Sequence, residues 1–244
     1  MRSLAVIPSL LTVVLIHEIG HVLAAVAGRV GIREIMLGLG RVLLSFNVGG
    51  ARLSIRLWPV GGGVDIDEEG WAAAPLWAQR AMLLGGPAAN IAGAWLMFAA
   101  GKLMATQGMA GLTVRLKDCV LFATSMLWSL MAATAQGFAQ CIWGGASGRM
   151  FIGPVGAAAW FHQEVEYVSL PVWLVVTGAF SAGAGLFNLL PLPPLDGGRA
   201  VIAGARARLG MRGMHLIERA GVAVLVLFGI VVALQDIVIL LTGP

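Results

Sequence analysis

The feature that most constrains this sequence is a series of long apolar runs. A helix that spans a bilayer needs about 20 consecutive, mainly apolar residues, and five stretches of the chain reach that length. Only 11% of the 244 residues are charged and 59% are hydrophobic, whereas roughly 25% of the residues in a soluble domain are charged. The sequence therefore predicts an all-α protein that crosses a membrane several times. The five runs are residues 4–27, 81–105, 120–143, 172–190 and 217–241.

Ionisable residues interrupt the first run, where His17, Glu18 and His21 form an HExxH motif. Positions i and i+4 lie on the same face of a helix, so both imidazoles can bind one metal ion while Glu18 acts on water beside it. A charge at the centre of a membrane helix costs roughly 2.5 to 3.5 kcal/mol on insertion scales, so such residues usually mark function. The motif predicts a zinc site, and two histidines that only bond across helices are the alternative.

Asp196 is the candidate for a third ligand, because zinc hydrolases normally use three protein ligands and keep the fourth position for water. It lies just after the run at 172–190, within the segment NLLPLPPLDGG at residues 188–198. The prolines of this segment prevent a continuous helix. Broken backbone at membrane depth is tolerated only where it is buried in protein or lines a cavity. The break therefore predicts a functional site around Asp196.

Residues 42–58, between the first two apolar runs, have the pattern of a β-hairpin. Leu53, Ile55 and Leu57 alternate with polar residues, and the adjacent Gly49 and Gly50 mark a turn. An irregular glycine-rich loop is the alternative.

The two motifs, HEIGH and NLLPLPPLDGG, together resemble the site-2 protease family of intramembrane zinc metalloproteases. LLGGPAAN at residues 83–90 is similar to the GPxxN signature of the family's second core helix. FIGPVGAAA at residues 151–159 resembles a segment of the bacterial branch that regulates sigma-E. The resemblance covers nearly the whole chain. Members of that branch usually carry PDZ domains, for which residues 106–120 leave no room, so we expect a single protease domain over residues 1–244 without a PDZ domain.

The resemblance implies a role for each matching residue. His17, His21 and Asp196 would hold Zn²⁺, and Glu18 would be the general base. Asn188 and Asn90 would bind the substrate backbone or support the site, with hydrogen bonding between helices as the alternative. The hairpin would offer its edge to a substrate in extended conformation.

The basic residues predict how the chain is oriented. Arginines are concentrated in residues 29–80 and 199–219, and Lys and Arg collect on the cytoplasmic side of membrane proteins. The first helix would then run inward, which places the HExxH motif in its cytoplasmic half. For Asp196 to reach the same depth, the helix at 172–190 must also run inward.

For the helix at 172–190 to run inward, the chain must cross the membrane an even number of times between it and the helix at 81–105. We therefore expect residues 120–143 to lie along the outer membrane surface or to dip into it, which leaves four spanning helices, at 4–27, 81–105, 172–190 and 217–241. A full crossing paired with a second one near residues 151–161 is the alternative.

These observations predict an intramembrane zinc metalloprotease of the bacterial inner membrane, with its active site toward the cytoplasm. The expected partners are the lipid bilayer and single-span membrane substrates, such as an anti-sigma factor or a signal-peptide remnant. The net charge of +4 does not indicate nucleic-acid binding, because the basic residues are spread over loops. A metal transporter or sensor and an inactive scaffold that binds membrane segments are the alternatives, and the intact Glu18 argues against both. No pattern in the sequence indicates an oligomeric state.

Overall fold

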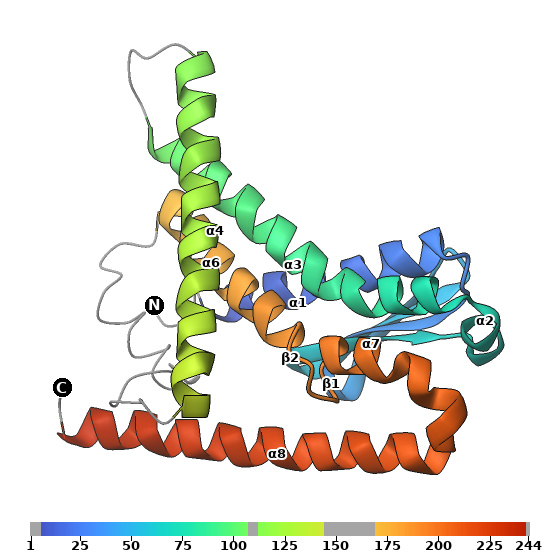
Figure 1. Cartoon of the computed structure of the whole chain (residues 1–244). Helices are drawn as coiled ribbons and strands as arrows, with labels where there is room; N and C mark the ends of the chain where they lie inside the picture. The colour runs from blue at the N-terminus through green and yellow to red at the C-terminus, as the bar shows by residue number, and fades with distance from the viewer. Residues whose placement is uncertain (1–5, 107–111, 144–168, 243–244) are drawn as a thin grey trace.

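A computed structural model describes residues 6–106, 112–143 and 169–242 (Figure 1). Within these ranges the chain is mainly helical, with one small β-sheet formed by residues 32–66, which follow the first helix. The elements are α1 (Val6–Ala27), β1 (Ile32–Val48), β2 (Ala51–Ile66), α2 (Glu68–Ala73), α3 (Leu76–Ala105), α4 (Leu112–Trp143), α6 (Leu170–Asn188), α7 (Asp196–Ile202), η2 (Ala203–Ala205) and α8 (Arg206–Thr242).

Five of the described helices are long and apolar enough to cross a membrane. Four of them cover most or all of the runs that the sequence predicted to span, although α3 begins earlier than expected, at Leu76, α6 ends earlier, at Asn188, and α8 begins at Arg206. The fifth is α4, whose candidate span is Thr113–Gly137. The described part of the chain therefore has the helices of a protein that crosses the membrane several times.

Helix α4 bears on the expectation that residues 120–143 lie at the membrane surface. It packs along α3, where Ala123 joins a buried cluster with Ala94, Phe98 and Ala182 (Figure 1). By length and composition it qualifies for a full crossing, which is the alternative stated above. The paired crossing near residues 151–161 lies outside the described residues. The surface position of this segment stays a prediction.

Helix α3 lies between α1 and α6 and holds them together. It is antiparallel to α1, because Gly20 lies opposite Gly85 while His17, one turn earlier, hydrogen-bonds Asn90, further along α3. A Cβ added to Gly20 would overlap the carbonyl of Gly85, so the backbones of the two helices are in direct contact. Small residues allow this close approach between membrane helices.

Helices α1 and α6 run in the same direction (Figure 1). Near their N-terminal ends, the hydroxyl groups of Ser9 and Thr177 are 2.9 Å apart. Eight residues along α1 from Ser9 lies His17, and the end of α6 at Asn188 leads into the segment that carries Asp196. The two motifs consequently reach the same end of the helix bundle, as the topology argument requires.

The predicted hairpin is present, but it is longer than the sequence indicated. Its turn is formed by Gly49 and Gly50, both at positive φ, as a type I′ turn requires. The strands pair in antiparallel fashion and extend to Ile32 and Ile66, beyond the predicted bounds of 42–58. The alternation of polar and apolar residues stops in the glycine-rich part of β2, so the pattern could not reveal the full length.

The second half of β2 returns along the first half of β1. Ile32 pairs with Ile66 and Leu37 pairs with Gly62, whereas residues 42–48 pair with residues 51–56. The sheet packs beside α1. After it, Asp67 caps α2 by accepting a hydrogen bond from the Gly70 amide. That bond and the ion pair with Arg33 lower the pKa of the Asp67 carboxyl.

Replacing Gly20 by alanine should destabilise the helix bundle, because the new methyl group meets α3 backbone that cannot move aside. Overpacking of this kind costs about 1–3 kcal/mol. Gly183→Ala on α6 is the matched control, since nothing lies within 4 Å of its added Cβ, and it should be neutral or stabilising by up to about 1 kcal/mol. Unfolding in detergent measures both variants. Equal stability of the two would contradict the proposed contact.

Candidate active site

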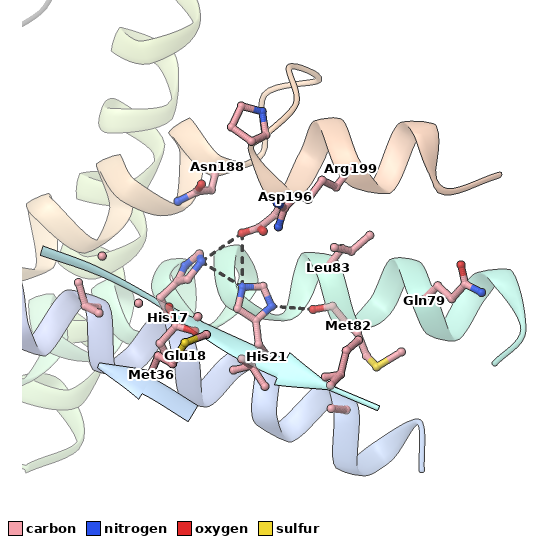
Figure 2. A pocket seen from close by; sticks show the side chains of 18 of the residues that line it. His17, Glu18, His21, Met36, Gln79, Met82, Leu83, Asn188, Asp196 and Arg199 are labelled. Atoms are coloured by element: carbon pink, nitrogen blue, oxygen red, sulfur yellow. Dashed lines mark hydrogen bonds and ion pairs between the residues drawn. The ribbon is translucent and has the colours of Figure 1, made fainter. Parts of the chain in front are cut away.

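The structure brings together the three side chains that the sequence predicted as metal ligands. His17 and His21 project from one face of α1, and Asp196 is the first residue of α7 (Figure 2). The Nε2 atoms of the histidines are 3.1 Å apart. The Asp196 Oδ2 atom lies 3.1 Å from Nε2 of His17 and 3.4 Å from Nε2 of His21. Three potential ligand atoms thus form a nearly equilateral triangle.

The triangle has the dimensions of a tetrahedral zinc site. Zinc lies about 2.0–2.1 Å from nitrogen and oxygen ligands, so the ligand atoms of a tetrahedral site are about 3.3 Å apart. The Oδ2 atom of Asp196 is buried without a hydrogen-bond partner, although both Nε2 atoms are close to it. This geometry fits three lone pairs that point at one ion. Two imidazoles and one carboxylate are also ligands that zinc accepts.

Gly86 of α3 keeps the space between the two histidines open. A Cβ added at Gly86 would overlap Nε2 of His21 and lie 2.7 Å from Nε2 of His17. It would therefore occupy the position where both Nε2 atoms point. Among the described residues, His17, His21 and Asp196 are the group that could hold a metal ion, and the absence of a side chain at Gly86 leaves room for one.

A second contact orients each histidine. The Nδ1 atom of His21 lies 2.7 Å from the carbonyl oxygen of Met82, so it carries the proton and leaves Nε2 free for a metal (Figure 2). The Nδ1 atom of His17 lies 3.1 Å from the side-chain amide of Asn90. Partners of this kind fix the ring and tautomer of metal-binding histidines.

The partners of Asn90 determine which way its amide faces. If Nε2 of His17 binds metal, its Nδ1 carries the proton, so the amide oxygen of Asn90 must accept from it. The amide nitrogen then faces the Ser181 hydroxyl, which in turn donates to the backbone carbonyl of Asn90 at 2.9 Å. Every polar atom of this buried chain has a partner in that arrangement.

The two asparagines that the sequence singled out have different surroundings. Asn90 is buried and has hydrogen bonds with His17 of α1 and Ser181 of α6. These contacts fit both a supporting role and hydrogen bonding between helices, so the role of Asn90 stays a prediction. Asn188 donates to the carbonyl of Ala184 within its own helix and lines the cavity described below. The sequence did not indicate Ser181 or the Met82 carbonyl, because a single hydroxyl or backbone atom has no distinctive pattern. It included Gly86 in the GPxxN signature, but without a role.

Glu18 lies between the histidines and the sheet. Its side chain is only 4% exposed, and its Oε2 atom is buried without a hydrogen-bond partner. A Cβ added at Gly62 would lie 2.7 Å from the Oε1 atom of Glu18, so β2 passes directly beside the carboxylate. This carboxylate is therefore next to the three candidate ligands without being one of them.

These residues line a cavity of about 730 Å³. Its walls come from α1, α3, the second half of β2, α7 and the beginning of α8. One part of the lining is polar and includes Gln79, Asn188, Arg199, His215 and Glu218. The cavity is large enough for several residues of an extended peptide, and it gives a substrate and water access to Glu18.

Comparison with known proteins agrees with this chemistry. A Chlamydia trachomatis (serovar D) protein described as "Putative zinc metalloprotease" is 31% identical over 147 residues, which make up 56% of this chain and 23% of that protein. The chain thus matches less than a quarter of the length of this relative.

The sequence model of "Peptidase family M50" matches residues 5–232, which include the HExxH motif, the hairpin and the segment around Asp196. With its apolar helices, this match makes the chain a multi-pass membrane protein. Because the match spans most of the chain, the protein belongs to peptidase family M50, the site-2 protease family that its two motifs resemble.

Proposed function

We propose that this membrane metalloprotease uses zinc, held by His17, His21 and Asp196, to hydrolyse peptide bonds of membrane-spanning proteins. The observation that carries the proposal is the position of Glu18, a buried carboxylate beside three converging ligand atoms in a cavity that a peptide can enter. A transport pathway would need ligands along several helices, whereas the candidate ligand atoms in the described part of the chain converge on one position.

The protein groups around the metal keep its ligands in place. Asn90 and the Met82 carbonyl orient the two imidazoles, and the contact of Gly85 with Gly20 sets the separation of α1 and α3. When bound, a zinc ion would polarise the scissile carbonyl, activate water and stabilise the charge that develops on the carbonyl oxygen.

Glu18 moves the proton in this reaction. The Oε2 atom accepts a proton from water as the water oxygen attacks the carbonyl carbon of the scissile bond. The same carboxyl then donates that proton to the amide nitrogen, and the bond between carbon and nitrogen breaks. The products are a new carboxylic acid, which passes its remaining proton to the amine or to water, and a new amine, and Glu18 returns to its ionised state.

The substrate would bind in extended conformation along the second half of β2. Residues 62–66 pair with β1 on one side, and several of them line the cavity beside Glu18 on the other. An extended peptide can add to such an edge through main-chain hydrogen bonds. This edge lies outside the predicted hairpin bounds of 42–58. Strand addition would also unwind a helical substrate, whose peptide bonds are otherwise shielded by the helix.

For the cellular setting we propose the bacterial inner membrane, with the arginine-rich residues 29–80 and 199–219 in the cytoplasm. Single-span proteins, including anti-sigma factors and signal-peptide remnants, are the substrate class. In this orientation α1 and α6, which run in the same direction (Figure 1), would both run inward, and Glu18 would lie in the cytoplasmic half of the membrane.

The first test measures metal content and cleavage of a model transmembrane peptide by purified protein in detergent. The wild type should bind about one zinc ion per chain. Glu18→Gln should retain the metal and lose activity by at least roughly 10²- to 10⁴-fold, since it has no base. Asp196→Ala should lose most of the zinc as well as the activity. Cleavage by Glu18→Gln would exclude the role of this residue, and bound metal without cleavage by the wild type would favour a scaffold.

Gly86→Ala should prevent zinc binding while the protein stays folded, because the added methyl group occupies the space between the histidines. Metal analysis after gel filtration measures the loss. Gly183→Ala, with open space around its added Cβ, is the control and should bind as the wild type does. Full zinc occupancy in Gly86→Ala would show that the ion does not lie where the two Nε2 atoms point.

Asn90→Ala should weaken zinc affinity by about 10- to 100-fold, since it removes the partner of His17, and Ser181→Ala should have a smaller effect in the same direction. Chelator competition measures both. Thr177→Val is the control on α6, because Thr177 bonds Ser9 away from the ligands. If Asn90 instead binds substrate, its replacement will raise KM and leave the zinc affinity unchanged.

A further inference from the structure

The last helix touches the segment that presents Asp196. A Cβ added at Gly221 of α8 would overlap the carbonyl group of Pro193, so the helix backbone rests directly on the proline segment. Any residue other than glycine at this position would push the helix and the segment apart. No sequence pattern connects α8 with the chemistry, since its apolar run carries no candidate ligand.

The opposite side of the same segment is equally confined. A Cβ added at Gly198 would overlap the backbone of Leu192 and Pro193, and one at Gly197 would overlap the Leu189 carbonyl. The segment from Leu189 to Pro193 is therefore held between the first turn of α7 and the side of α8. Asp196 is the residue immediately before these two glycines, so a shift of the segment moves the carboxylate.

A charge pair joins the same two helices one turn away. The Arg199 Nε atom lies 3.3 Å from an oxygen of Glu218. Arg199 follows Gly198 directly, and Glu218 precedes Gly221 by three residues, which places both α8 residues on one face. The pair limits rotation of α8 about its contact with Pro193. It also lines the cavity, so this contact is at the site and not at the far end of the bundle.

We propose that Gly221 is a positioning residue that acts through Pro193 to hold the Asp196 carboxylate at the ligand triangle. The proposal rests on the proposed function, because it assumes that Asp196 binds the metal. In this arrangement α1 supplies two ligands, which groups of α3 orient, whereas α8 orients the third ligand. Separation of α8 from the proline segment would withdraw one ligand while the histidine pair remains intact.

The test compares the wild-type protein with Gly221→Ala and, as the matched control, Gly229→Ala, which lies in the same helix with nothing within 4 Å of its added Cβ. Zinc affinity is measured by chelator competition, and the visible spectrum of bound Co²⁺ reports the ligand set. Gly221→Ala should weaken zinc binding about 10-fold or more, in the range found for groups that orient ligands. Its Co²⁺ spectrum should move toward that of Asp196→Ala. Gly229→Ala should match the wild type.

A double variant distinguishes positioning from a general loss of stability. If Gly221 acts through Asp196, adding Gly221→Ala to Asp196→Ala should cause no further loss of affinity for the remaining histidine pair. If Gly221→Ala lowered zinc affinity by the same factor in the wild-type and Asp196→Ala backgrounds, the proposal would be overturned. Wild-type zinc affinity in Gly221→Ala would overturn it as well. Wild-type protein that binds no metal would instead overturn the proposed function, and this inference with it.

Glu218→Gln provides a second variant for the case in which Gly221→Ala does not fold. It removes a partly exposed ion pair without adding volume, so we expect a loss of zinc affinity of about 2- to 5-fold. That loss should also disappear in the Asp196→Ala background. An unchanged affinity in Glu218→Gln, together with failure of Gly221→Ala to fold, would overturn the role assigned to α8.

Discussion

The close approach of α1 and α3 is the constraint on which the site depends. Gly20 and Gly85 let the two backbones touch, and this contact places Gly86 directly opposite the histidine pair. A larger residue at any of the three positions would either separate the helices or fill the space between the imidazoles. The same packing that stabilises the bundle therefore also creates the volume in which a metal ion fits. In a bilayer, large apolar side chains gain little free energy by contacting each other instead of lipid. Helix association therefore depends on close backbone packing, which small residues allow.

Several polar groups around the candidate ligands are linked by hydrogen bonds between the helices. His17 is held by Asn90, and Asn90 by Ser181, so one chain of contacts links α1, α3 and α6. His21 donates from Nδ1 to the backbone carbonyl of Met82 in α3. Unpaired polar groups are costly in an apolar medium. Two buried oxygens of the site, Oε2 of Glu18 and Oδ2 of Asp196, have no hydrogen-bond partner among the described residues. A base for hydrolysis needs a free oxygen, and a metal ligand needs a free lone pair.

The site is enclosed from three directions by elements that differ in kind. The helices α1 and α3 supply the histidines and their partners, β2 passes beside Glu18, and α8 covers the proline segment that carries Asp196. Glycine occurs at each of these approaches because the backbone itself, and not a side chain, forms the wall. A substrate that enters beside β2 would meet strand edge, general base and metal ligands within a single cavity. Under the proposed function, a peptide bond held along this strand edge would lie next to the general base and the metal ligands.

The sequence by itself determined the membrane helices, the HExxH face of α1 and the pairing of that face with Asp196. These features depend on local rules: length of apolar runs, helical spacing and the breaking effect of proline. The turn at Gly49 and Gly50 was predictable for the same reason. Only the tertiary structure decided that Asn90 contacts His17, that the strands reach Ile32 and Ile66, and that α8 contacts the segment before Asp196. Such contacts join residues far apart in the chain, and they depend on how closely backbones approach, which no local pattern encodes.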